Sequence, residues 1–173
     1  MSESAPNRPV ILLVDDNPHD VVLIRLAFRK VGIIDTIQLV KNGGDAMRYI
    51  KGEGPYRDRS QFPPPTLVLL DLKMPQTSGF DVLNWIRNQP ELESLVVVVM
   101  SGSRNDSDIE KAYTLGANSY LVKPTRFEDL VKMMESLKDS CGPRKRGSRV
   151  MATAEHLPGV RPLTTASMVP AGA

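Results

Sequence analysis

Cysteine is almost missing from this chain, and its single cysteine, Cys141, excludes an internal disulfide and favours a reducing compartment. A signal peptide is missing too, because the opening MSESAPNRP is polar and acidic rather than basic and then apolar. The longest apolar runs, VILLV and LVVVVM, are far too short to span a bilayer. We therefore expect a soluble, cytoplasmic protein that does not enter a membrane.

A strong net charge of either sign is missing as well. The 173 residues carry a net charge of only +2. Residues 141–173 contribute +4, which leaves −2 for residues 1–140. The basic character therefore belongs to the C-terminal segment, and the main part of the chain lacks the basic surface of a nucleic-acid-binding protein.

The chain does contain short β-branched runs that alternate with helical patterns, and 41% of its residues are hydrophobic. Strands are expected at residues 10–14, 36–40, 66–70, 95–100 and 119–122. Helices are expected at residues 18–31, 45–51, 80–88 and 108–115, with a last helix after Thr125. Five such units predict an α/β fold, a doubly wound, flavodoxin-like parallel sheet of five strands in the order 2-1-3-4-5.

Two helices show a candidate buried face in the sequence. For the first helix, which Gly32 ends, the expected apolar face is Val22, Leu26, Phe28 and Val31. For the last helix, Thr125 and Glu128 predict a capping box. Its expected apolar face is Phe127, Leu130, Val131, Met134 and Leu137.

The repeating pattern predicts one domain at residues 9–140. Residues 1–8 and 141–173 lack apolar periodicity, so we expect a disordered N-terminus and a disordered basic tail. Residues 52–65, GEGPYRDRSQFPPP, form a loop much longer than is usual between such elements. The three prolines should make the end of this loop stiff and extended.

Polar and charged residues stand where the expected strands end. The first strand ends in Asp15 and Asp16, the third in Asp71, the fourth in Ser101 and the fifth in Lys123. Strands one and three are neighbours at the point where the strand order reverses, so the three carboxylates should converge there. Clustered carboxylates need a cation, and oxygen ligands with room for water and phosphate favour Mg²⁺.

These groups suit phosphoryl transfer to a carboxylate, which forms an acyl phosphate. Such a transfer needs mainly positioning and neutralisation of the phosphoryl oxygens. Mg²⁺ would meet one oxygen, the Lys123 ammonium a second, and the Ser101 hydroxyl or a backbone N–H a third, while Gly102 leaves room for the incoming group. No histidine or other general base stands near Asp71 in the sequence. The site is therefore expected to accept phosphate rather than to act as an enzyme.

The motifs DD (15–16), DLKMP (71–75), SG (101–102) and KP (123–124) strongly resemble the receiver domain of two-component response regulators over residues 9–140. The resemblance implies that Asp71 is the phosphoacceptor and that Mg²⁺ is the cofactor. It also implies that Asp15 and Asp16 form the acidic metal pair, with the Lys73 carbonyl as a further protein ligand.

The same resemblance implies roles for the residues at the ends of the last two strands. Ser101 would be the signalling hydroxyl, Lys123 the phosphate-binding lysine, and Tyr120 the aromatic residue that reorients with Ser101. Family members often have a cis peptide bond at the position of Lys123–Pro124, which X-Pro bonds tolerate.

The stretch NPHDVVLIRLA and the long loop at 52–65 resemble the small, single-domain regulators that are paired with bacterial phytochromes. Too little patterned sequence follows residue 140 for an output domain. The implied partner is a sensor histidine kinase, which could be a bacterial phytochrome. Output would go through phosphorylation-dependent protein binding or a phosphorelay to a histidine phosphotransfer protein, and a homodimer is a further candidate.

Two other functions compete with this interpretation. Metal-dependent phosphatases with an aspartyl nucleophile resemble D-x-D at the first strand, but position 17 is Asn. A flavin protein of the same strand order would need a Ser/Thr-rich phosphate loop after strand one, which this sequence lacks. His19 is interpreted as an exposed residue of a first helical turn rather than a ligand, and PRKRGSR as a solvated segment.

Overall fold

The computed structural model describes residues 9–33 and 37–140. Its five strands form one parallel sheet in the order β2-β1-β3-β4-β5, which confirms the predicted fold class. The strands are β1 (Ile11–Val14), β2 (Ile37–Val40), β3 (Leu67–Leu70), β4 (Val96–Ser101) and β5 (Ser119–Val122). The helices are α1 (Pro18–Lys30), α2 (Gly43–Lys51), α3 (Gly79–Arg87), α4 (Asp106–Thr114) and α5 (Phe127–Ser140), with 3-10 turns η1 (Gly54–Tyr56) and η2 (Pro90–Leu92).

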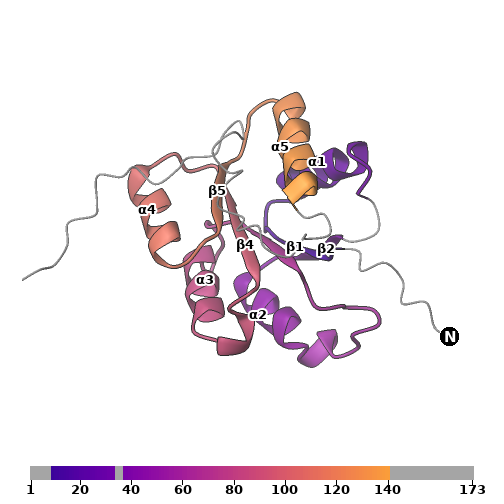
Figure 1. Cartoon of the computed structure of the whole chain (residues 1–173), viewed down its shortest axis with the longest axis vertical. Coiled ribbons are helices and arrows are strands. Elements are labelled where there is room, and N and C mark those ends of the chain that lie inside the picture. Colours follow the sequence, from indigo (N-terminus) through magenta and orange to yellow (C-terminus); the bar gives the residue numbers. More distant parts are fainter. Residues whose placement is uncertain (1–8, 34–36, 141–173) are drawn as a thin grey trace, which may run out of the picture.

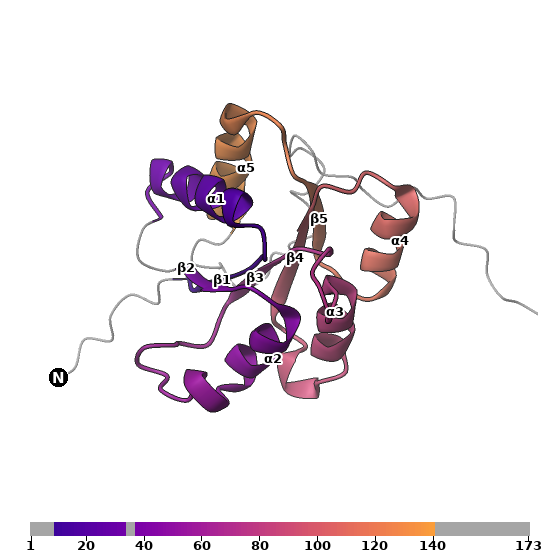
Figure 2. The ribbon, with the colours of Figure 1, turned by 180° about the vertical axis from the view of Figure 1, so that it is seen from behind.

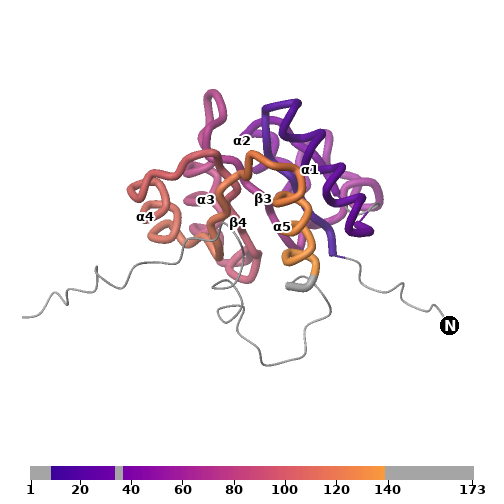
Figure 3. Tube along the Cα trace, turned by 90° about the horizontal axis from the view of Figure 1, so that it is seen from above, coloured from indigo at the N-terminus to yellow at the C-terminus, as the bar shows by residue number. Residues whose placement is uncertain are grey.

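The helices cover both faces of the sheet. α1 and α5 lie side by side over one face, and α2, α3 and α4 cover the other (Figures 1 and 2). The view in Figure 3 shows the same pairing of α1 with α5. This division follows from right-handed crossovers, because the chain moves outward from β1 in one direction to β2 and in the other direction to β3, β4 and β5.

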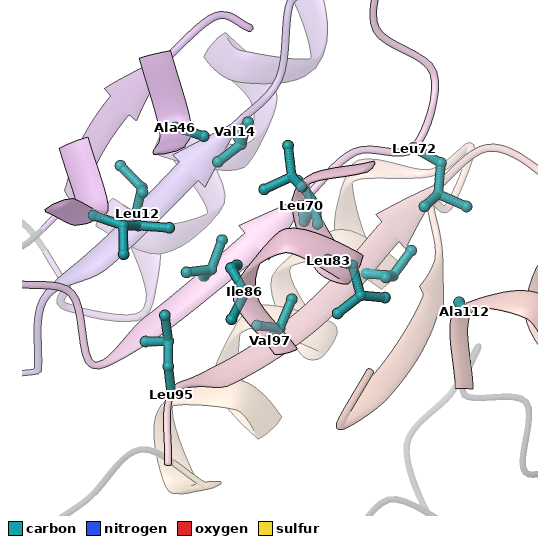
Figure 4. Close-up of a cluster of buried hydrophobic side chains, with 14 of the residues drawn as sticks. Leu12, Val14, Ala46, Leu70, Leu72, Leu83, Ile86, Leu95, Val97 and Ala112 are labelled. Carbon is teal, nitrogen blue, oxygen red and sulfur yellow. The ribbon is translucent and has the colours of Figure 1, made fainter. Parts of the chain in front are cut away.

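The strands are buried on both faces, which explains their continuous apolar runs. Leu12 and Val14 of β1 point into the core under α2, α3 and α4 (Figure 4), whereas Ile11 and Leu13 point into the core under α1 and α5. β3 and β4 alternate in the same way, as strand geometry requires. The sheet is therefore held between two apolar layers, and its carboxyl edge is the place where polar groups gather.

The predicted apolar face of α1 is confirmed at Phe28 and Val31, which lie in or against the core, but it was wrong at Val22 and Leu26. The residues that α1 buries are Val21, Ile24, Ala27 and Phe28. Val22, Leu23 and Leu26 are instead exposed, at 56%, 44% and 45% of their surface. In the run VVLIRLAF both faces of the helix are apolar, so the helical period fits more than one frame and periodicity alone selected the wrong one.

The start of α5 also differs from the prediction. The helix begins at Phe127, so Thr125 stands one residue too early to cap it, and the Arg126 carbonyl accepts from the Leu130 N–H at 3.2 Å. The predicted apolar face is confirmed, because Leu130, Met134 and Leu137 are buried and Phe127 and Val131 pack against the same core, as does Met133.

The long loop at 52–65 is folded against α2. Its 3-10 turn carries Tyr56, whose ring lies 5.2 Å from that of Tyr49 and 5.3 Å from that of Phe62. The Arg59 guanidinium donates to the carbonyls of Tyr49 and Ile50 at 2.8 and 2.7 Å, which satisfies the open end of α2. Tyr49 in turn donates to the Pro63 carbonyl at 2.9 Å. The loop is therefore an ordered extension of the α2 core.

Three expectations lie partly or wholly outside the described residues: the disordered N-terminus at 1–8, the basic tail at 141–173, and the first residue of the second strand. In the described part of the chain, no helix combines the length and apolar character needed to cross a membrane.

Candidate functional site

The site lies at the carboxyl edge of the sheet, where β1 and β3 run side by side. Val14 is in register with Leu70, so Asp15 and Asp71 leave the two strands at the same level. The backbone holds both residues in place, because the Asp71 N–H donates to the Val14 carbonyl at 2.9 Å and the Asp15 N–H to the Val40 carbonyl at 3.2 Å. Parallel pairing thus continues one residue past the strands and fixes the two carboxylates next to each other.

Asp15, Asp16 and Asp71 form the acidic cluster that the sequence predicts. One carboxylate oxygen from each lies within 4.8 Å of the others. Asp15 and Asp71 are buried, at 1% and 7% exposed, while Asp16 is open to solvent. Three carboxylates at this spacing fit a hard divalent cation, and the exposed side leaves room for water and phosphate oxygens in its shell.

Lys123 enters the cluster from the end of β5. Its ammonium lies 2.7 Å from Asp15 Oδ2, 2.8 Å from Asp20 Oδ2 and 3.6 Å from Asp71 Oδ1. Burial alone would lower the pKa of Lys123, but the hydrogen bonds to Asp15 and Asp20 outweigh it and the pKa is raised above its ordinary value. Lys123 is therefore a fixed positive charge beside Asp71.

Asp20 is a site residue that the sequence reasoning missed. It stands in the first turn of α1, two residues after Pro18, and was not considered as part of the strand-end constellation. The available signal was its position, because a side chain in the first turn of the helix after β1 lies above the carboxyl edge of the sheet.

The Asp71 carboxyl is hard to ionise. Its pKa is raised from 3.8 to about 6, because burial and the neighbouring Asp15 carboxylate outweigh the lowering effect of Lys123 and of the backbone N–H groups of Leu72 and Lys73. Burial disfavours the charged form of a carboxyl group, so a cation bound next to it stabilises that form. The charge state of Asp71 is thus coupled to that of the acidic cluster to which it belongs.

Gly79 fixes the segment that follows Asp71. Its N–H donates to the Leu72 carbonyl at 3.0 Å, and a Cβ at this position would overlap the Asp71 carbonyl and lie 2.8 Å from the Leu72 Cα. The capping box between Ser78 and Asp81 starts α3 at the same place. Gly79 was missed because nothing in a single sequence reports such a close backbone approach.

Ser101 and Tyr120 meet at the end of β4. Both are fully buried. The Ser101 hydroxyl accepts from the Ser103 N–H at 3.2 Å, and the Tyr120 hydroxyl donates to the Ser103 carbonyl at 2.9 Å. The Ser103 hydroxyl donates to Asp108 of α4. The two predicted switch residues are therefore brought together, and they are linked to α4 through Ser103.

The other predicted positions have simpler surroundings. His19 is exposed, as expected, and its N–H donates to the Asn17 side chain at the start of α1. Gly102 is exposed, and a Cβ at this position would meet no atom within 4 Å. The space that was expected beside Gly102 for the incoming group is therefore open. Lys73 is exposed, and its carbonyl remains a predicted ligand. The Lys123–Pro124 bond is trans, so the cis bond expected from the resemblance was wrong.

Comparison with known proteins gives the same picture. The probable methanogenesis regulatory protein FilR2 of Methanothrix harundinacea is 38% identical over 131 residues, covering 75% of this chain and 81% of that protein. Response regulator Rcp1 of Synechocystis is 33% identical over 138 residues, covering 80% of this chain and 92% of that one. The structure of the Mn²⁺-bound form of Rcp1 matches with a TM-score of 0.70 at 31% identity, over 82% of this chain and 100% of that one.

A second solved structure, response regulator RPA3017 in red light signaling of R. palustris, matches with a TM-score of 0.71 at 34% identity. That match covers 75% of this chain and 91% of RPA3017. The chain also matches the response regulator receiver domain over residues 11–135. With this match and the strand-end carboxylates and lysine in place, the chain belongs to the receiver-domain family of two-component response regulators.

Proposed function

We propose that Asp71 accepts a phosphoryl group from a sensor histidine kinase and that the phosphorylated chain signals by binding a partner protein. The observation that carries this proposal is the position of Asp71, which is buried in an acidic cluster with the Lys123 ammonium 3.6 Å from its carboxylate. A relay of the phosphoryl group to a histidine phosphotransfer protein is the second form of the same output.

The reaction is a displacement at phosphorus. A carboxylate oxygen of Asp71 forms the new bond, the bond between phosphorus and the kinase's phosphohistidine breaks, and the imidazole leaves and takes a proton from solvent. Lys123 would donate to one phosphoryl oxygen and Ser101 to another. In this reaction the phosphoryl group ends on Asp71 itself, and the chain converts no separate substrate. We therefore propose that the chain acts as a phosphoacceptor rather than as an enzyme.

We propose Mg²⁺ as the cofactor, held by Asp15, Asp16, Asp71 and the Lys73 carbonyl. A divalent cation at this position supplies neutralisation of the charge on the phosphoryl oxygens. The spacing of the three carboxylates supports the site, and the Mn²⁺-bound form of the relative Rcp1 supports a divalent ion in this family.

The partner would be a kinase that approaches the carboxyl edge of the sheet. Val22, Leu23 and Leu26, which we call the α1 apolar stripe, are exposed on the helix next to this edge. Exposed apolar groups beside a reaction site favour a docking surface. The likeness to the bacteriophytochrome response regulator RtBRR, which is 33% identical with a TM-score of 0.65, favours a bacterial phytochrome as this kinase. We propose a cytoplasmic location for the chain.

A homodimer through α4, β5 and α5 remains a proposal with less support. Among the described residues, the large hydrophobic side chains with high exposure are those of the α1 apolar stripe, not of α4 or α5. Such a dimer would have to rely on charged and polar contacts.

The alternative phosphatase function has little support. That chemistry needs an acid/base carboxylate two positions after the first aspartate, where this chain has Asn17. Asn17 caps α1 instead, because its side chain accepts from the His19 N–H at 3.0 Å. A bound flavin would colour the purified protein yellow, so colourless protein would exclude the flavin alternative.

The decisive experiment is phosphorylation with Mg²⁺ and a small phosphodonor such as acetyl phosphate. We expect an acid-stable, alkali-labile adduct on Asp71, mapped by mass spectrometry. Asp71→Asn should abolish it, and Asp16→Ala should greatly reduce it by weakening Mg²⁺ binding. Labelling that persists in Asp71→Asn would refute the proposal.

A further inference from the structure

Lys123 has two carboxylate partners of different kinds. Its ammonium lies at almost equal distance from Asp15 and Asp20, 2.7 and 2.8 Å. Asp15 belongs to the acidic cluster with Asp16 and Asp71, whereas Asp20 does not. Asp20 is also only partly exposed, at 31% of its side chain, so its bond to the ammonium is shielded from water on one side.

The two partners should respond differently when the site is loaded. A divalent cation bound in the cluster would neutralise much of the charge of Asp15. Asp15 would then attract the Lys123 ammonium less strongly. Asp20 lies outside the cluster and can keep its hydrogen bond. An ammonium has three donors, so Lys123 can hold Asp20 with one and point another at a phosphoryl oxygen on Asp71.

We propose that Asp20 is a positioning residue that holds the Lys123 ammonium in place for the phosphoryl group once Asp15 is engaged by the cation. The inference rests on the proposed function and extends it to a residue of α1. Without Asp20, the long Lys123 side chain would have to be ordered by the phosphoryl group itself, and that ordering costs binding free energy.

Asp20 also stands at the third position of a helix, where an acid stabilises the helix dipole. Asp129 provides a matched control for this effect. It occupies the same position in the first turn of α5, and its printed ion pair is an exposed one with Lys132 at 3.8 Å. A purely helical role predicts similar consequences of Asp20→Ala and Asp129→Ala, limited to stability.

The test is calorimetric titration of the full chain with beryllofluoride, a phosphoryl mimic, at saturating Mg²⁺. Asp20→Ala should weaken beryllofluoride binding about tenfold, because the cost of ordering a lysine side chain is moved to the binding step. Asp20→Asn, which keeps an acceptor but loses the charge, should fall between Asp20→Ala and wild type. Asp129→Ala should bind as wild type does.

A double-mutant cycle separates positioning from simple repulsion. In a Lys123→Met background, Asp20→Ala should cause no further loss, because its effect passes through Lys123. If Asp20 acted only as a negative charge near an anion, then Asp20→Ala and Asp20→Asn would both tighten binding. Unchanged or tighter binding in these variants overturns the inference while leaving the proposed function intact. If wild type itself does not bind beryllofluoride, the proposed function and the inference fail together.

Discussion

At the scale of single residues, Asp71 combines two opposing requirements. It must be ionised to attack phosphorus, and it lies where burial opposes ionisation. Lys123, 3.6 Å from the Asp71 carboxylate, opposes this cost, and a cation held by the acidic cluster would oppose it further. We expect the same groups to stabilise the phosphoryl oxygens.

The pKa of Asp71 gives a prediction for stability against pH. Its value of about 6 in the folded chain exceeds the unperturbed 3.8, so the folded chain binds this proton more tightly than the unfolded chain does. The free energy of unfolding should therefore fall as pH rises from about 4 to about 6 and stay low above it. Asp71→Asn removes this loss and should stabilise the metal-free protein by on the order of 1–3 kcal/mol at neutral pH.

Urea unfolding in the presence of a chelator, at about pH 5 and about pH 7.5, measures this difference. Added Mg²⁺ should stabilise wild type at the higher pH and have little effect on Asp71→Asn. A variant that is no more stable than wild type at the higher pH would contradict the burial argument.

Gly79 gives a second prediction at this scale. Gly79→Ala should lower the free energy of unfolding by about 2 kcal/mol or more, because its Cβ would meet the backbone of Asp71 and Leu72 and neither can move without displacing the site. Gly102→Ala, where a Cβ meets no atom within 4 Å, is the control and should change stability little. Equal stabilities of the two variants in urea unfolding would contradict this account.

At the scale of single elements, α1 is the helix with two apolar faces. Val21, Ile24, Ala27 and Phe28 serve the core, and the α1 apolar stripe faces solvent. We expect the double variant Val22→Ser, Leu26→Ser to slow phosphotransfer from the cognate kinase by about tenfold, the typical effect of truncating apolar anchors at an interface. Phosphorylation by acetyl phosphate should not change, because neither residue reaches the acidic cluster.

The two phosphodonors provide the internal control for this prediction. Phosphorylation rates with the kinase and with acetyl phosphate are measured on the same preparations. Thr114→Ala, at an exposed position of α4, serves as a surface variant away from α1. If both donors slow down equally, the stripe affects the site and not docking. Equal kinase rates in all variants would place the docking surface elsewhere.

The elements also show what a single sequence can and cannot predict. Strand order, the convergence of Asp15, Asp16 and Asp71, and the apolar face of α5 follow from local patterns and from the geometry of parallel sheets. The buried face of α1 cannot be predicted in this way, because the run VVLIRLAF fits two helical frames and tertiary packing selects one of them. The packing of the 52–65 loop on α2 cannot be predicted either, since it depends on contacts of Arg59 with carbonyls nine and ten residues away.

At the scale of the whole molecule, the path from the site to α4 is already assembled. Tyr120 is fully buried, and its hydroxyl donates to the Ser103 carbonyl, while Ser103 also contacts Ser101 and Asp108. The predicted reorientation of Tyr120 with Ser101 would therefore start from a fully buried position. We expect the response to pass through the segment that joins β4 to α4.

The last prediction concerns where a phosphoryl group on Asp71 changes the molecule. It adds nearly two negative charges within reach of Ser101 and Lys123, and it can bias two states only by its differential interaction with them. If Ser101 turns to the phosphoryl group, its bond from the Ser103 N–H is lost and the contact of Ser103 with Asp108 must adjust.

Amide hydrogen exchange with Mg²⁺, with and without beryllofluoride, should therefore change across residues 102–138 and little in α2. Ser101→Ala should still accept phosphate but lose most of this change. A response confined to α1 and α2 would mean that the signal leaves from the β2–β1 end of the sheet rather than from the β4–β5 end.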